Sequence, residues 1–308
     1  MKLLEHLYRA RFSWAVRALC STPPLAPGHA PFVVLSMVQH RDVRPYLLAI
    51  KSFARFLSPH RIVLVADPSL NQADRVLLRH HIPHIEFRDA AEFHRNGIPR
   101  GGCWERLNAI AEYGRNTYLV QLDADTVTTK DLPEVRQAIL DKVCFTLGTE
   151  NVQPILASKE IAHEAQKRLT EQSHAQLRAE AALDQFDTTG RFRYARGCAG
   201  FSGFSPGSVN PALVHEVSCG MASALGTQWS AWGTEQFTSN LLVCSSPGAR
   251  ILPHPLYCHP GRMTSSTKFL HFIGYVRYQS ALYAQLARQL AQELSTANSG
   301  NTMRQLGP

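Results

Sequence analysis

Residues Tyr118–Thr126 read YLVQLDADT, an apolar run that ends at two aspartates one residue apart. The apolar part predicts a buried strand, and the polar end cannot remain in the interior of a sheet. A strand that stops in this way brings Asp123 and Asp125 to one edge of the sheet. Paired carboxylates at such an edge suit a hard divalent ion, Mg²⁺ or Mn²⁺, that also holds an anionic ligand.

Strands and helices alternate along the chain before this stretch. Apolar runs predict strands at 32–38, 61–66 and 84–87, and helical spacing predicts helices at 44–57, 70–81 and 102–113. This alternation indicates an α/β fold with a mostly parallel sheet flanked by helices. Ligands of such sheets bind beyond the carboxyl ends of the strands, which is where Asp123 and Asp125 are expected.

The second half of the chain predicts further helices and a glycine-rich strand. We expect helices at 131–142, 159–183 (with breaks), 211–225, 234–243 and 275–294, strands at 143–147 and 196–206, and a loop at 251–263. Four prolines mark 21–31 as a linker. The predicted organisation is therefore an N-terminal helix and linker (1–31), a single domain (32–294) and a disordered tail (295–308).

Composition excludes several classes of protein. The 308 residues are 44% hydrophobic and 18% charged, which is enough for a sizeable core. The net charge of +8 is diffuse, with no run of five basic residues, so we do not expect nucleic-acid binding. Seven widely spaced cysteines without a C-x-x-C pair predict free thiols and a cytoplasmic location rather than a zinc site.

The first 20 residues predict an amphipathic basic helix. Apolar side chains can share one side of it, namely Leu3, Leu4, Leu7, Trp14 and Leu19. Neither a secretory signal nor a membrane-spanning run is expected from the sequence. Two interpretations remain open: the helix packs on the domain, or it attaches loosely to an anionic membrane.

The motifs as a set resemble the GT-A glycosyltransferases, which use nucleotide-sugar donors. The resemblance covers about 32–277 and rests on three motifs. Asp123-Ala124-Asp125 matches the D-x-D at the end of the fourth sheet element. His271 and Gly274 match the H-x-x-G of the glycogenin-like retaining branch, with Arg277 in place of its later lysine. Trp232–Asn240 (WGTEQFTSN) matches the acceptor-facing helix.

The resemblance implies a function and a set of site residues. It implies sugar transfer from a nucleotide-diphosphate sugar, with UDP favoured as the nucleotide. The acceptor is unknown and could be a glycan or a glycolipid. The acceptor side is expected in the C-terminal half of the chain. Mn²⁺ or Mg²⁺ would be held by Asp123, Asp125 and His271. Catalytic or acceptor-contacting roles fall to Glu235 and Gln236. Donor-binding roles fall to Gln39, His40, Arg106, Asp123, Asp125, Arg262 and Lys268.

Each site residue also has a purely structural interpretation. The two aspartates suit turns or helix caps, and His271 suits a core between two phenylalanines. Glu235 suits the first turn of any helix, and Arg106 a solvated helix face. Trp229 and Trp232 suit either sugar stacking or a core.

Two other functions compete with sugar transfer. Asp123–Val127 (DADTV) also fits the nucleophile motif of haloacid-dehalogenase-like phosphatases. That motif normally lies on the first strand, and it needs a later acidic pair and a lysine that the sequence does not offer. The third candidate is a non-catalytic nucleotide-sugar-binding protein. It is disfavoured because the metal and acceptor positions all carry competent residues.

Overall fold

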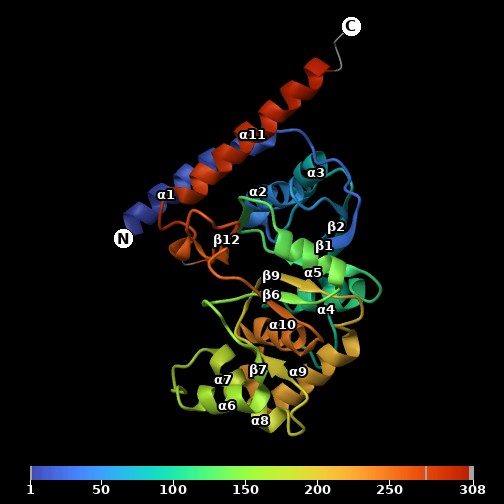
Figure 1. Ribbon diagram of the computed structural model, residues 1–308, viewed down its shortest axis with the longest axis vertical. Coiled ribbons are helices and arrows are strands. Elements are labelled where there is room, and N and C mark those ends of the chain that lie inside the picture. The colour runs from blue at the N-terminus through green and yellow to red at the C-terminus, as the bar shows by residue number, and fades with distance from the viewer. Residues whose placement is uncertain (1, 275, 305–308) are drawn as a thin grey trace.

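A seven-stranded sheet runs through the centre of the computed structural model, which describes residues 2–274 and 276–304 (Figure 1). The strand order is β10-β6-β9-β4-β1-β2-β3. The strands are β1 (Ala30–Val38), β2 (Pro59–Ala66), β3 (Ile85–Asp89), β4 (Tyr118–Leu122), β6 (Phe145–Leu147), β9 (Cys198–Phe204) and β10 (Arg250–Leu252). All neighbours pair in parallel except β9, which is antiparallel to β4 and β6. The predicted α/β fold with a mostly parallel sheet is confirmed.

Helices cover both faces of this sheet. On one face, Val34 and neighbouring side chains pack against α2 (Val43–Ala54), α3 (Gln72–His81) and α5 (Pro133–Asp141). On the other, Val33 and Leu35 pack among residues of α4 (Trp104–Tyr113), α9 (Pro211–Leu225) and α10 (Thr234–Ser245). Successive strand residues point to opposite faces, so an uninterrupted apolar strand serves both cores.

The predicted elements of the second half are partly revised. The region 159–183 forms three short helices, α6 (Ser158–Gln166), α7 (Ala175–Ala181) and α8 (Leu183–Phe186). In the chain these helices lie between β7 (Leu156–Ala157) and β8 (Arg193–Tyr194), which pair with each other. The expected loop 251–263 contains the end of β10 and also β11 (Tyr257–Cys258). Strands of two or three residues are too short to give a periodic signal.

A smaller three-stranded sheet supports the edge where β4 ends. Its order is β11-β12-β5, with β12 at Phe269–His271 and β5 at Thr126–Thr128. The N-terminal and C-terminal helices, α1 (Lys2–Ala15) and α11 (Leu282–Arg304), pack side by side and against this sheet (Figure 1). The closing helix was expected to begin at 275, which lies outside the described residues. The expected disordered tail is helical up to Arg304, and 305–308 are not described.

The α1 helix packs on the domain, but not with the side that the sequence suggests. Phe12 and Ala15 are buried, and Leu19 is buried in the 3-10 helix Val16–Ser21 that follows. Leu7 and Trp14, expected on the same side as Leu19, are exposed. A 14-residue helix is marginal alone, so tertiary packing of this kind has to hold it. No helix among the described residues is long and apolar enough to cross a membrane.

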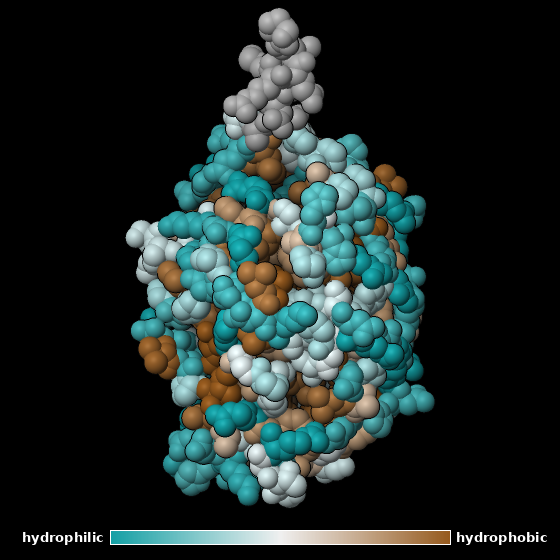
Figure 2. Space-filling model, turned by 45° about the vertical axis from the view of Figure 1, so that its right-hand side comes forward, coloured by the Kyte–Doolittle hydropathy of each residue, from teal (hydrophilic) through white to brown (hydrophobic). Residues whose placement is uncertain are grey.

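The surface between these elements is mixed. On the face drawn in Figure 2, hydrophobic side chains form separate groups among hydrophilic ones. Scattered apolar side chains of this kind are usual on a globular protein and need no partner. That face therefore does not by itself indicate a site.

Candidate active site

Asp123 and Asp125 follow directly on the last residue of β4. The backbone N–H of Asp123 donates to the Gly200 carbonyl at 2.9 Å, and the Thr126 hydroxyl donates to the Asp123 carbonyl at 2.8 Å. These bonds fix the turn between β4 and β5. Both carboxylates therefore lie at the carboxyl end of the parallel strands, the edge at which such sheets bind ligands.

The pairing of β12 with β5 brings His271 to the same place. His271 pairs with Thr126, and the Phe272 N–H donates to the Asp125 carbonyl at 2.8 Å. Nε2 of His271 then lies 3.1 Å from Oδ1 of Asp125 and 3.9 Å from Oδ2 of Asp123. One potential ligand atom from each residue lies within 4.8 Å of the others. The structure thus assembles the Asp–Asp–His group.

This group fits a divalent cation. Two carboxylates and one imidazole are ligands that Mg²⁺ and Mn²⁺ both accept, with the imidazole favouring Mn²⁺. The space for the imidazole depends on Gly200, because a Cβ at that position would stand 2.1 Å from Cε1 of His271. Real Cβ atoms do not approach so closely. The strand β9 therefore carries a glycine where the histidine ring passes.

Two arginines balance the charge of the aspartates. Arg106 of α4 is buried and pairs with Asp123, and its second nitrogen lies 3.1 Å from Oε2 of Glu235. Arg277 pairs with Asp125 and also donates to Asp42 Oδ1 at 2.7 Å. The expectation of a solvated Arg106 is therefore wrong. Each aspartate thus has its own arginine partner.

The surroundings shift the pKa values of the two aspartates in opposite directions. Burial raises the pKa of Asp123, and Arg106 offsets this only in part. Burial also acts on Asp125, but the nearby His271 and Arg277 outweigh it and hold the pKa of that carboxyl well below its usual range. Asp125 therefore remains ionised, which is the state that binds a cation.

Glu235 lies in the first turn of α10 and is almost fully buried. Burial raises the pKa of its carboxyl to about 7, and the Arg106 guanidinium opposes this shift. Glu235 reaches the aspartates only through Arg106, in the chain Glu235–Arg106–Asp123. A buried carboxyl that titrates near neutrality beside a charged group is typical of functional sites.

Cys198 was not singled out by the sequence as a site residue. Its Sγ lies 3.1 Å from Nδ1 of His271, on the side of the ring away from Asp125. With a cation bound, an Nδ1–H that donates to sulfur would leave the Nε2 lone pair to serve as a ligand. The available signal was the glycine-rich segment 196–206, which predicts close approach of the backbone to another group. No sequence motif pointed to Asp42, the second carboxylate that pairs with Arg277.

The loop before α4 is strained. Gly101, Gly102 and Cys103 all have positive φ, at 77°, 56° and 74°. Glycine adopts this conformation freely, whereas a cysteine there costs about 1–2 kcal/mol. Oε1 of Glu105 accepts the Gly101 N–H at 2.8 Å and holds the turn. This turn sets the start of the helix that delivers Arg106.

Comparison with known proteins identifies the architecture. No protein-family model matches the chain, and no curated protein matches it. Among solved structures, an active-site mutant of LgtC superposes with a TM-score of 0.50 at 13% identity, over 85% of this chain and 95% of that one. The fold is GT-A. WbbM, a bifunctional glycosyltransferase, matches with a TM-score of 0.45 at 15% identity, over 88% of this chain and 46% of its own. Mouse xyloside xylosyltransferase 1 matches with a TM-score of 0.41 at 10% identity, over 80% of this chain and 98% of its own.

Among the described residues, the other predicted site residues form no hydrogen bond or ion pair with the Asp–Asp–His group. Nζ of Lys268 donates to Glu134 of α5 at 2.7 Å, so it is directed to that helix. His40 is exposed and bonds to Asp74 at 2.7 Å. Gln39 is half-buried, Arg262 is exposed, and Gln236 donates to Gln176 of α7 at 3.2 Å. None of these contacts joins them to the aspartates.

A cavity of 240 Å³ borders His271 at the carboxyl edge of the GT-A sheet. Its lining includes Cys198, His254 and His259. Burial lowers the pKa of both His254 and His259, so these imidazoles are neutral. Nε2 of His254 is buried and has no hydrogen-bond partner among the described residues. A ligand hydroxyl entering this cavity would supply the missing partner.

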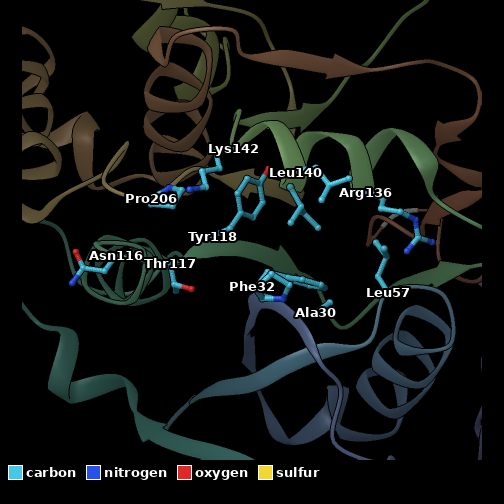
Figure 3. Close-up of a pocket in the computed structure, with 12 residues that line it drawn as sticks. Ala30, Phe32, Leu57, Asn116, Thr117, Tyr118, Arg136, Leu140, Lys142 and Pro206 are labelled. Carbon is cyan, nitrogen blue, oxygen red and sulfur yellow. The ribbon is translucent and has the colours of Figure 1, made fainter.

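A larger cavity lies at the wrong end of the sheet for this chemistry. It measures 680 Å³ and is lined by residues at the starts of β1 and β4, including Ala30 and Tyr118, and by Arg136 and Leu140 of α5 (Figure 3). Parallel sheets bind ligands at the opposite, carboxyl edge. We therefore assign the active site by its chemistry rather than by cavity size.

Proposed function

We propose that the protein is a metal-dependent glycosyltransferase that moves a sugar from a nucleotide-diphosphate sugar to a sugar-containing acceptor. One observation carries the proposal: Asp123, Asp125 and His271 converge within 4.8 Å at the carboxyl edge of a GT-A sheet. Supporting it, a galactosyltransferase with this fold, LgtC, has been solved with donor and acceptor sugar analogues. UDP is the donor base that the resemblance favours.

Asp123, Asp125 and His271 would hold Mn²⁺ or Mg²⁺. When bound, such an ion neutralises the two phosphates of the leaving group and orients them. Arg106 partly offsets the effect of burial on Asp123 and pairs with Glu235 at the same time. Arg277 pairs with Asp125 and Asp42, and we propose that its guanidinium also helps to balance the charge of the departing diphosphate. Gln39 and His40 remain candidates for the donor base and ribose.

The acceptor is proposed to enter from the C-terminal half. The first turn of α10 carries Glu235 and Gln236, and Trp232 just before it is 69% exposed. An exposed tryptophan beside a buried carboxyl suits a sugar, because the ring packs on the apolar face of the pyranose. Trp229, by contrast, is buried and donates to Ser218 at 3.1 Å, so it belongs to the core.

Three finer parts of the proposal follow from the sequence. The free state of all seven cysteines supports a cytoplasmic location. Residues 1–20 are proposed to make a peripheral membrane contact, which suits a glycolipid acceptor. Retention of the anomeric configuration is proposed from the pattern of His271 and Gly274, and NMR of the new linkage tests it.

Donor hydrolysis tests the function. The wild-type protein should hydrolyse a UDP-sugar slowly with Mn²⁺ and lose this activity in chelator, and it should be stabilised against heat by UDP only with the metal. Hydrolysis of a phosphomonoester through an aspartyl-phosphate would establish the phosphatase instead. Stabilisation by nucleotide-sugars without any turnover would indicate the binding protein.

A further inference from the structure

The α1 helix has two apolar faces, and only one of them is covered. Phe12 and Ala15 face the domain and are 3% and 1% exposed. On the opposite side, Leu3, Leu7 and Trp14 are 84%, 51% and 67% exposed. Burying large apolar side chains is favourable, and the fold leaves these three uncovered. They therefore remain available to pack against apolar material outside the chain.

The exposed side chains form one continuous row along the helix. Leu3, Leu7, Ala10 and Trp14 are spaced by four, three and four residues, and all four are exposed. Side chains at this spacing lie on one side of an α-helix. We call these four residues the α1 stripe. The helix lies along the outside of the molecule beside α11, so the stripe is not shielded by the sheet domain (Figure 1).

Positive charge borders the α1 stripe. Arg11 and Arg17 are exposed on its two sides, and the guanidinium of Arg288 lies over the Trp14 ring at 5.1 Å. The one acidic residue of the segment, Glu5, pairs with Arg9 at 3.5 Å. Arg17 also lines a 460 Å³ cavity together with the exposed Arg41 and Arg44.

We propose that the α1 stripe docks on the surface of an anionic lipid bilayer. The leucines and Trp14 would enter the boundary between headgroups and acyl chains, while Arg11, Arg17 and Arg288 contact lipid phosphates. A second copy of the chain fits less well as the occupant. Two such faces would bring their arginines together, and like charges repel.

Stacked aromatic rings link the docked helix to the active site. The Phe12 ring stacks on Tyr283 at 3.9 Å, and Tyr283 stacks on Phe272 at 4.1 Å. Phe272 follows His271 in the chain. A membrane-bound α1 would therefore hold the Asp–Asp–His group at a fixed position relative to the bilayer. This consequence rests on the proposed function and favours an acceptor that is itself anchored in lipid.

Vesicle binding by the full-length, metal-free protein tests the proposal. Vesicles with ~30 mol% phosphatidylglycerol should bind it at least ~10-fold more strongly than pure phosphatidylcholine, and raising salt from ~0.1 to ~0.5 M should weaken the binding. The triple variant Leu3→Ser, Leu7→Ser, Trp14→Ser should lose most of the binding. A matched control replaces three exposed apolar side chains elsewhere, Val76→Ser, Leu140→Ser and Leu169→Ser, and should bind like the wild type.

Tryptophan emission reports which face inserts. Trp104 and Trp229 are buried, so in a Trp232→Phe background the exposed emission comes from Trp14 and should shift to the blue on anionic vesicles. The proposal is overturned if the protein does not bind anionic vesicles or if the emission of Trp14 does not shift. It is also overturned if both triple variants lose vesicle binding equally. So does a concentration-dependent dimer that shifts Trp14 without lipid. These measurements need neither donor nor metal, so their failure is distinct from failure of the proposed function.

Discussion

Nε2 of His271 lies 3.1 Å from Oδ1 of Asp125, although 146 positions separate the two residues in the chain. The contact exists because β12 pairs antiparallel with β5, the strand that begins right after Asp125. Neither strand exceeds three residues. The geometry of the proposed cation site therefore depends on a small sheet that is separate from the seven-stranded one.

Replacing Asp125 by asparagine should abolish most donor turnover. The change keeps the shape of the side chain but removes the charge that binds the cation and pairs with Arg277. We expect a loss of about 100- to 1000-fold in kcat for UDP-sugar hydrolysis with Mn²⁺. Asp67→Asn, at the end of β2, serves as the control for an aspartate at a strand end outside the group. Activity equal to that of wild type would contradict the site.

Gly200→Ala should displace His271 although it replaces none of the proposed ligand residues. The new methyl group would overlap the imidazole, so the ring must move or β9 must bend. We expect at least ~10-fold weaker Mn²⁺ binding, by analogy with the loss of supporting groups around metal ligands. Electron paramagnetic resonance of bound Mn²⁺ measures this. As a control, Gly190→Ala meets no neighbouring atom; its positive φ of 71° costs the fold some stability, but the Mn²⁺ affinity should remain that of the wild type.

Cys198→Ala should weaken metal binding through the orientation of His271. The sulfur lies 3.1 Å from Nδ1, and without this contact the ring loses the group that orients it. A ~10-fold rise in the Kd for Mn²⁺ is expected, with partial recovery in Cys198→Ser. Cys219 offers a matched control, because it contacts His215 at 3.5 Å away from the site. If Cys219→Ala weakens Mn²⁺ binding equally, the orienting role of Cys198 is excluded.

Glu235 should make the protein less stable as pH rises toward neutrality. Its folded pKa of about 7 exceeds the value of 4.5 expected in the unfolded chain, so the folded state binds more protons between these values. The free energy of unfolding therefore falls by about 3 kcal/mol as pH rises through this window. Glu235→Gln should flatten the profile in urea unfolding between pH 5 and 8. The exposed Glu164→Gln should leave the slope intact, and an unchanged slope in Glu235→Gln would refute the assignment.

His81 should cause the opposite dependence in acid. It is fully buried, both ring nitrogens lack hydrogen-bond partners among the described residues, and burial lowers its pKa to about 4. The unfolded chain takes up the proton first, so about 3 kcal/mol of stability is lost as pH falls from 6.5 to 4. Thermal unfolding of His81→Leu should show a smaller drop in Tm over this range. The exposed His60→Leu should not.

The sequence predicts the first half of the fold closely because its signals are local. Strands β1 and β2 are continuous apolar runs. In the second half, α9 has the same bounds, Pro211–Leu225, in the prediction and in the structure. Asp123 and Asp125 could be placed at the sheet edge because a strand must end where its polar residues begin. The broken helix at 159–183 was also foreseen in outline.

The contacts that depend on tertiary pairing could not be read from the sequence. Cys198 reaches His271 because β9 runs antiparallel beside β4 and its Gly200 leaves room for the histidine ring. Asp42 meets Arg277 across 235 positions. His271 itself was found by resemblance to a motif, since a three-residue strand has no periodicity of its own. Lys268 and Gln236 bond to Glu134 and Gln176, and no local pattern predicts these partners because they are distant in sequence.

The reversed direction of β9 has a consequence for how this enzyme can diversify. Strand β6 ends at Leu147 and β9 begins at Cys198 on the same rim, so the excursion 148–197, with α6, α7 and α8, leaves and rejoins the sheet beside the cation ligands. Both its anchors are fixed by strand pairing. Changes within 148–197 can therefore alter this lobe while the strand pairing that places Asp123, Asp125 and His271 is kept.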